Sequence, residues 1–366
     1  MSILKLNCRN FRSYGALSLE FRSNFIVFYG ENGAGKTNIL EAISLFSSDR
    51  GLRKASLSDL TYYKANVVSW SLDMVISEDN YKTFLSTSAP EGRRLAKIDN
   101  TAVTSLTKFE ELLWILWTVP GMDNLFIGAS SDRRVFFDHL VSGYDKKHKY
   151  HLKNLFKLQK ERLHIISHKN DKVWLGVLEK NMAEENIRVT KTRLEFINVL
   201  HETFRNYPSN FLRPIVNISG AVEEIYERCS EENAVCEVAE SLERNRWSDT
   251  EKQTTSLSVH RTFWRVEHPQ TRLEAELCSS GEQKAFIVSL ILAVARIYQK
   301  FRNGVPVLLL DDLMARLDKV RRKNLVNELL SINFQTFFTG TDQYLFEELE
   351  DTAQIYDVAE SIVTAI

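Results

Sequence analysis

Residues 30–37 read Gly30-Glu31-Asn32-Gly33-Ala34-Gly35-Lys36-Thr37, which is a complete G-x-x-x-x-G-K-[ST] phosphate loop. An apolar, β-rich run at 25–29 precedes the loop, and residues 38–46 carry apolar side chains at helical spacing. The loop therefore lies between a strand and a helix, as phosphate binding requires. Its glycines allow successive N–H groups to converge on phosphate oxygens at the positive end of the helix. This stretch predicts a triphosphate site.

Each part of the loop has an expected role. We expect the backbone of residues 30–35 to surround the phosphates, Lys36 to reach the terminal phosphates, and the Thr37 hydroxyl to ligate Mg²⁺. The alternative is a glycine-rich turn that matches the pattern by chance. The flanking strand and helix patterns favour the phosphate loop.

Two carboxylates follow a buried-strand pattern much later in the chain. Residues 305–310 are all apolar, and Asp311 and Asp312 come directly after them. Burying an acidic pair is costly without a cation, so we expect Asp311 to hold Mg²⁺ through water. We expect Asp312 to polarise the attacking water. An acidic pair at a surface turn is the alternative, and the apolar run before it argues against that.

A third motif lies between these two. Residues 278–284 read Cys278-Ser279-Ser280-Gly281-Glu282-Gln283-Lys284 and precede an apolar helix pattern at 285–298. Ser279 with Glu282 three residues later matches a capping box, which is the simplest interpretation. A serine and a glycine at a helix N-terminus also suit a second phosphate-binding surface, formed by residues 279–282.

The first residues predict a hairpin, with strands at 3–8 and 16–21. Its turn carries Arg12, which is a candidate nucleotide contact; a solvated turn arginine is the alternative. Further short strands are expected at 67–77, 82–88 and 95–99. The apolar segment 112–119 ends at Pro120-Gly121, a possible domain boundary.

The composition is that of an ordinary globular protein, with 44% hydrophobic and 26% charged residues. No apolar run approaches the ~18 residues of a membrane-spanning helix, and the first residues do not form a signal-peptide pattern. We therefore expect a cytoplasmic protein without a membrane partner. The four cysteines show no metal-binding spacing, so reduced thiols are expected.

The pattern changes from Tyr144 onward. Apolar side chains repeat at helical spacing over residues 152–200, which predicts two or three long helices forming an arm. Residues 144–172 contain nine lysines and arginines against three acids, whereas residues 222–251 contain ten acids against three arginines. Such charge commonly marks a solvated face, and a basic segment is also typical of a phosphate-backbone contact. The candidate contacts are Lys146, Lys147, Lys149, Lys153 and Lys157.

The three motifs together resemble the ATPase heads of the ABC and SMC class. The sequence Ser279-Ser280-Gly281-Glu282 is similar to the ABC signature motif, and Leu317-Asp318 follows the acidic pair. The segment between the motifs is too short for a long coiled coil, and in this the chain resembles the RecF family of bacterial recombination mediators. Further similar stretches are Asn10-Phe11-Arg12, Arg50-Gly51-Leu52-Arg53, residues 133–138 and Val259-His260-Arg261.

The resemblance implies an α/β fold, in which an ABC-type P-loop ATPase lobe with a mixed sheet carries an inserted helical lobe. The ATPase lobe would comprise residues 1–120 and 255–366, and the mainly helical arm residues 121–254. The implied cofactors are ATP and Mg²⁺. Lys36, Ser279 and Asp312 would be catalytic, and Asp318 would lie beside the nucleotide.

The implied function is that of an ATP-dependent, DNA-binding recombination mediator in DNA repair and replication-fork maintenance. Such a protein would be a weak, DNA-stimulated ATPase that binds duplex or gapped DNA. It would act as an ATP-bound homodimer, because in this class the signature helix serves nucleotide held by a second copy. RecR- and RecO-like mediator proteins and a recombinase would be its partners.

Two other classes share part of the pattern. A nucleotide-binding subunit of an ABC transporter has the same three motifs, although the basic arm argues against it. A P-loop kinase of small molecules would explain Lys36 and Thr37 but would leave Ser279 unused. ATP turnover with duplex DNA, with detergent-solubilised membrane protein or with neither separates these classes.

Several positions depart from the family pattern. Cys278 replaces the leucine before the signature serine, Ala315 replaces a serine, and Gly121 stands where an acidic residue is usual. These departures bear on hydrolysis and subunit communication rather than on nucleotide binding. The switch histidine of ABC ATPases has no evident counterpart in residues 337–342, where the polar candidates are Thr339, Thr341 and Asp342.

Overall fold

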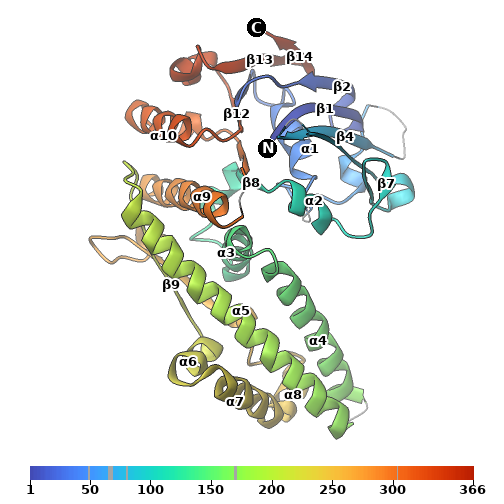
Figure 1. Cartoon of the computed structure of the whole chain (residues 1–366), viewed down its shortest axis with the longest axis vertical. Helices are drawn as coiled ribbons and strands as arrows, with labels where there is room; N and C mark the ends of the chain where they lie inside the picture. The colour runs from blue at the N-terminus through green and yellow to red at the C-terminus, as the bar shows by residue number, and fades with distance from the viewer. Residues whose placement is uncertain (48–49, 65–68, 80, 169–170, 303) are drawn as a thin grey trace. The chain divides into compact units, whose positions relative to one another are not determined.

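The computed structural model describes residues 1–47, 50–64, 69–79, 81–168, 171–302 and 304–366. The described chain packs into two compact units (Figure 1). The first comprises residues 1–123 with 298–366, and the second comprises residues 124–297. The division expected from sequence assigned residues 255–297 to the ATPase lobe, and that boundary stays a prediction. No helix of the described residues is long and apolar enough to cross a membrane.

A six-stranded sheet of the first unit carries the phosphate loop. Its strand order is β14-β13-β3-β12-β11-β8, and every neighbouring pair is parallel except β13 with β14. Parallel strands are buried on both faces, which explains why their sequences are almost continuously apolar. The strands are β3 (Phe25–Tyr29), β8 (Ile115–Thr118), β11 (Val307–Leu310), β12 (Thr336–Gly340), β13 (Ala353–Ala359) and β14 (Ile362–Ala365).

A second sheet of the same unit is antiparallel, in the order β2-β1-β4-β5-β6-β7. Its first hairpin is longer than predicted, because Phe11 pairs with Tyr14 and leaves only two residues in the turn. The strand expected at 67–77 begins at Ser71, and residues 67–68 lie outside the described residues. The strands are β1 (Ser2–Phe11), β2 (Tyr14–Glu20), β4 (Ser71–Glu78), β5 (Tyr81–Ser88), β6 (Leu95–Ile98) and β7 (Thr101–Ala102).

One apolar core joins the two sheets of this unit. Ile3 and Leu6 of β1, Phe28 of β3 and Phe337 of β12 belong to a single buried cluster with Ile39 of the first helix. This helix, α1 (Lys36–Ser44), begins at Lys36, so the last two residues of the phosphate loop form its first turn. The unit also contains α2 (Thr107–Leu112) and α10 (Lys319–Ile332). The core therefore fixes the strand and helix that flank the loop.

The second unit is mainly helical, as the apolar spacing predicted. Its two long helices, α4 (His148–His168) and α5 (Lys172–Asn206), pack side by side (Figure 1). An antiparallel pair of short strands, β9 and β10, was not predicted. The other elements are α3 (Ser130–Tyr144), β9 (Ile215–Ser219), α6 (Ala221–Arg228), α7 (Glu231–Arg244), α8 (Arg246–Lys252), β10 (Phe263–Glu267) and α9 (Ser280–Arg302), whose last residues belong to the first unit.

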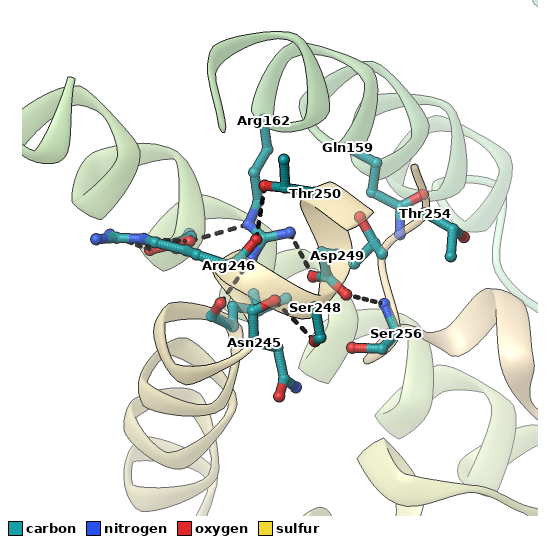
Figure 2. A network of polar contacts seen from close by, with 12 residues as sticks. Gln159, Arg162, Asn245, Arg246, Ser248, Asp249, Thr250, Thr254 and Ser256 are labelled. Carbon is teal, nitrogen blue, oxygen red and sulfur yellow. Dashed lines mark hydrogen bonds and ion pairs between the residues drawn. The ribbon is translucent and has the colours of Figure 1, made fainter. Parts of the chain in front are cut away.

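A buried charge network ties four helices of this unit together (Figure 2). Arg162 of α4 is fully buried, and it donates to Glu179 of α5 at 2.9 Å, to Asp249 of α8 at 2.7 Å and to the Leu242 carbonyl of α7 at 2.6 Å. Arg246 also pairs with Glu179, at 2.5 Å. A buried ion is tolerated only when its partners are complete, so this network fixes α4 in one orientation.

A second buried network holds α3 to α4 and α5. Arg193 of α5 donates two hydrogen bonds to the Asp138 carboxylate, at 2.9 and 2.8 Å, and His148 Nε2 lies 2.8 Å from Asp138 Oδ1. Arg193 also donates to the Val259 carbonyl and the Thr262 hydroxyl. Burial alone would raise the pKa of Asp138, but Arg193 and His148 hold it well below its usual range. The stretches 133–138 and 259–261 thus contribute to the packing of this unit.

Candidate nucleotide-binding site

The phosphate loop has backbone conformations that only glycine adopts easily. Gly30 and Gly35 have φ angles of 145° and 115°. A Cβ atom at Gly30 would lie 2.1 Å from the Val358 carbonyl oxygen, and one at Gly35 would lie 2.7 Å from the Tyr14 hydroxyl oxygen. On the side of β13 and β2 there is therefore no room for a side chain at Gly30 or Gly35. At Gly33, in contrast, a Cβ atom would meet nothing within 4 Å.

Lys36 is the only basic residue among residues 30–37, and its ammonium group lies inside the curve of the loop. Its Nζ donates to the carbonyl oxygens of Gly30 at 2.6 Å and Glu31 at 2.7 Å. Burial lowers the pKa of this ammonium group, and the nearby carboxylates of Asp312, Asp311 and Asp342 oppose that shift. The loop therefore combines converging N–H groups with one held positive charge, which suits an anionic ligand.

Thr37 and Asp311 meet although 274 residues separate them. The Thr37 hydroxyl donates to Asp311 Oδ1 at 2.9 Å, and the Thr339 hydroxyl donates to the same oxygen at 2.7 Å. This happens because β3, β12 and β11 are adjacent parallel strands whose carboxyl ends share one edge. Burial raises the pKa of Asp311, and the two hydroxyl donors oppose that shift. Hydroxyl and carboxylate oxygens are hard donors that fit Mg²⁺.

Asp312 lies in different surroundings from its neighbour. Its φ angle is 53°, an uncommon conformation for a non-glycine residue and one that is frequent at functional sites. Its backbone N–H donates to the Thr339 hydroxyl at 2.8 Å, which joins it to the Asp311 cluster. Its carboxylate is 37% exposed and lies 3.6 Å from the Arg316 guanidinium, whereas Asp311 is buried. The two acids can therefore take different roles.

Arg12 is engaged beside the first helix. Its guanidinium donates to both carboxylate oxygens of Glu41 at 2.8 Å, and to the Asp59 carbonyl at 2.8 Å. Glu41 is completely buried on α1, one turn beyond Thr37, and Arg53 contacts both Glu41 and Asn38. The predicted nucleotide contact of Arg12 stays a prediction. Sequence reasoning missed Glu41, although a lone acid in an apolar helix was a visible signal.

The signature stretch forms the capping box that was its simplest interpretation. Ser279 donates to Glu282 Oε2 from its backbone N–H at 2.8 Å and from its hydroxyl at 2.7 Å, and the Glu282 N–H returns a 3.4 Å bond to Ser279 Oγ. The helix α9 begins at Ser280, so Ser280 and Gly281 lie in its first turn. Contact of this helix end with phosphate stays a prediction.

Asp318 is also a helix cap in this structure, because its carboxylate accepts a hydrogen bond from the Arg321 N–H at 2.9 Å. Its expected place beside the nucleotide stays a prediction. Two departures from the family pattern lie in short helical turns, Gly121 in residues 120–124 and Ala315 in residues 314–316. The third, Cys278, directs its thiol to the carbonyls of Leu273 and Glu274.

Residues 2–364 match the model of the RecF/RecN/SMC N-terminal domain family. The chain belongs to this family. A DNA replication and repair protein RecF from Agrobacterium fabrum is 34% identical over 372 residues, which cover 100% of this chain and 99% of the relative. One from Rhizobium etli is 35% identical over 369 residues, covering 99% and 98%. The resemblance to the RecF family inferred from the motifs is thereby confirmed.

Solved structures confirm the fold. A structure described as the recombination mediator protein RecF-ATPrS in the RecFOR pathway matches with a TM-score of 0.86 at 22% identity, covering 100% of this chain and 98% of that one. An SMC head bound to the C-winged helix domain of ScpA matches with a TM-score of 0.54 at 17% identity, covering 100% and 96%. The predicted α/β fold of the ABC-type ATPase class is therefore correct.

Proposed function

We propose that this chain is an ATP-dependent, DNA-binding recombination mediator of the RecF family, acting in DNA repair and replication-fork maintenance in the cytoplasm. The proposal rests on one observation: the hydroxyls of Thr37, in the phosphate loop, and of Thr339 both donate hydrogen bonds to the same carboxylate oxygen of Asp311. The relatives named above as DNA replication and repair proteins support it, since they align over almost the full length. A second matching structure, described as RecF-ATP in the RecFOR pathway, supports ATP as the nucleotide.

The residues of the site would divide the work of hydrolysis as follows. Residues 30–35 would surround the phosphates with N–H groups, and the Lys36 ammonium would bind the terminal phosphates. The Thr37 hydroxyl would ligate Mg²⁺ directly and Asp311 would hold it through water. Bound Mg²⁺ would neutralise charge on the phosphates. Asp312 would orient the attacking water, for which its exposure suits it better than that of Asp311.

Dimer formation would complete the site. Residues 279–282 would contact nucleotide held by residues 30–37 of a second copy, and twofold symmetry would repeat that contact. Each hydrogen bond to a charged phosphate contributes about 1.5–3 kcal/mol, so two such contacts suffice to shift association at micromolar concentration. The outcome would be a weak ATPase whose dimer depends on ATP.

The basic segment around the start of α4 would bind DNA. Lys146, Lys147, Lys153 and Lys157 are exposed, and Lys149 is partly exposed. Lysines bind the phosphate backbone without reading bases, so duplex or gapped DNA would be bound with little sequence preference. By family resemblance, RecR- and RecO-like proteins and a recombinase would be the protein partners.

Measuring ATP turnover tests this proposal against its two rivals. We expect turnover to rise when duplex DNA is added and to stay unchanged with detergent-solubilised membrane protein. A rise only with membrane protein would favour an ABC transporter subunit, and phosphorylation of a small molecule would favour a kinase. Full-length similarity to RecF proteins already disfavours both rivals. No change with DNA would contradict the proposal.

A further inference from the structure

We propose that the outer face of α4 is a binding site for single-stranded DNA, on which unpaired bases stack against Tyr150 and Phe156. The inference rests on the proposed DNA-binding function and names the element that distinguishes an unpaired strand from duplex. We call this surface the α4 outer face. Its members are Lys149, Tyr150, Lys153, Phe156, Lys157, Lys160, His164 and His168.

The spacing of these residues places them on one side of the helix. Successive members are one, three or four residues apart, so at 3.6 residues per turn they lie within an arc of about 120°. All are exposed except Lys149, which is partly exposed. No acidic residue belongs to the face, and the neighbouring Glu161 accepts a hydrogen bond from the Trp174 indole. The charged residues of the face are therefore all basic, which suits a phosphate backbone.

The opposite side of α4 is held by buried contacts, so the helix cannot rotate and the side chains of the outer face stay directed to solvent. Arg162 is held by the buried network of Figure 2, and Gln159 donates to the Ser258 hydroxyl at 2.5 Å. Near the start of the helix, His148 is buried against Asp138. Leu155 lies in the apolar core of this unit. Rotation of α4 to hide its aromatic side chains would break all of these contacts.

Two aromatic side chains stand among the lysines of this face. Tyr150 is 66% exposed and Phe156 is 51% exposed, so neither contributes its full area to the core. The ring of Phe156 is held in place by His260, whose ring lies edge-on at 6.2 Å, and Lys160 Nζ lies 4.5 Å from the ring centroid. Because Lys160 covers one face of this exposed ring, a stacked base would displace the ammonium group, which could then pair with the phosphate of that nucleotide.

The two rings lie at separate places on the face. Tyr150 and Phe156 are six positions apart, which gives a rise of about 9 Å along the helix and an offset of about 120° around it. Each ring would therefore stack its own base, at two points along a strand that crosses the face. In duplex DNA the base faces are already stacked, so the rings would gain nothing there. In a single strand each base offers a free face, so the aromatic side chains favour the unpaired strand while the lysines bind either form.

The test uses the full chain with ATP and Mg²⁺, and it measures fluorescence anisotropy of labelled dT20 and of a 20-base-pair duplex. We expect Tyr150→Ala and Phe156→Ala each to weaken dT20 binding about 30-fold, the middle of the range for losing one stacked base. Duplex affinity should change less than twofold. The salt dependence of dT20 binding should keep its slope, since no phosphate contact is removed.

Trp247→Ala is the matched control, because Trp247 is a 72% exposed aromatic residue of α8 that does not belong to the face. It should leave both affinities unchanged, and the thermal unfolding of all three variants should match the wild type. Unchanged dT20 binding in the Tyr150 and Phe156 variants, or equal weakening of dT20 and duplex, would overturn the stacking face and leave the proposed function intact. A wild-type protein that binds neither probe would overturn the proposed function itself.

Discussion

Two adjacent carboxylates at the end of β11 show how local surroundings separate chemical roles. Asp311 is buried and accepts hydrogen bonds from Thr37 and Thr339, whereas Asp312 is partly exposed and has a positive φ angle. A buried carboxylate between two hydroxyls suits a fixed cation, and an exposed neighbour can reach water. Equal charge at adjacent positions therefore does not imply equal function.

Substitution of Asp312 and Lys36 should separate hydrolysis from nucleotide binding. We expect Asp312→Asn to keep ATP affinity within about threefold and to lose at least 100-fold in turnover, because only the orientation of water is removed. Lys36→Met should lose much of both, because its ammonium would contact phosphates in the ground state as well. Equilibrium binding and single-turnover hydrolysis measure the two effects, and equal loss of ATP affinity in both variants would contradict these roles.

Much of the nucleotide site could be predicted from the sequence, because each motif is a short run with its own flanking pattern. Thr37 and Asp311 could be assigned to one magnesium site because the phosphate loop follows one apolar strand and the acidic pair follows another. Thr339 was one of three polar candidates in residues 337–342, together with Thr341 and Asp342. The sequence did not indicate which of them contacts Asp311, because a single threonine on a strand carries no information about its hydrogen-bond partner. The contact between Arg12 and Glu41 joins a turn to a helix. The sequence of neither segment indicates that these two residues form a pair.

At the scale of elements, the second unit depends on buried charges as well as on apolar contacts. The helices α4, α5, α7 and α8 all contribute to the Arg162 network, which no apolar spacing predicts. Periodicity identified the long helices because it reports which side of a helix is buried. It could not predict the network, because a buried arginine and an exposed arginine look alike in sequence.

Removing the Arg162 side-chain charge should strongly destabilise the second unit. Arg162→Met would leave Glu179 and Asp249 buried with incomplete partners, and breaking a buried pair in this way costs about 3–5 kcal/mol. Arg244→Met is the control, since Arg244 is 63% exposed and pairs with the exposed Glu240 on the surface of α7, where a pair contributes under about 1 kcal/mol. Urea unfolding of both variants measures the difference, and similar losses in the two would refute the account of the network.

Three histidines that are buried or partly buried should make the stability of this unit depend on pH. Burial lowers the pKa of His148, His201 and His260 below the ordinary value of about 6.5. Below that pH the unfolded chain binds more protons than the folded one, so the free energy of unfolding falls as the pH falls. Urea unfolding at pH 7.5 and 5.5 should show this decrease.

His148→Asn should reduce that decrease, because it removes one of the histidines whose pKa is lowered in the folded state. His164→Asn is the matched control, since His164 lies on the exposed side of α4. It should preserve the decrease in stability between the two pH values. If the His148 variant kept the full pH dependence, burial of that ring would not be its cause.

For the whole molecule, the ATPase unit is assembled from both ends of the chain. Strand β3 lies between β12 and β13, so residues near the N-terminus depend on residues more than 300 positions later. The family resemblance predicted this assembly, whereas local patterns alone did not. The last two strands, β13 and β14, were missed because no motif lies in them and their neighbours are distant in sequence.

The central claim is that ATP brings two copies together across the Ser279 helix end. Ser279→Arg should block this dimer while leaving ATP binding near normal, since the phosphate loop is unchanged. Ser279→Ala controls for loss of the cap, which costs about 0.5–2 kcal/mol but adds no bulk.

Sedimentation velocity of Asp312→Asn in saturating ATP and Mg²⁺ tests that claim most directly, because slow hydrolysis should preserve the closed state. We predict a dimer in ATP at micromolar concentration, a monomer in ADP, and a monomer in both nucleotides when Ser279→Arg is added. A variant that binds ATP and yet sediments as a monomer would contradict the account, and residues 279–282 would then be only the helix cap that they form in this structure.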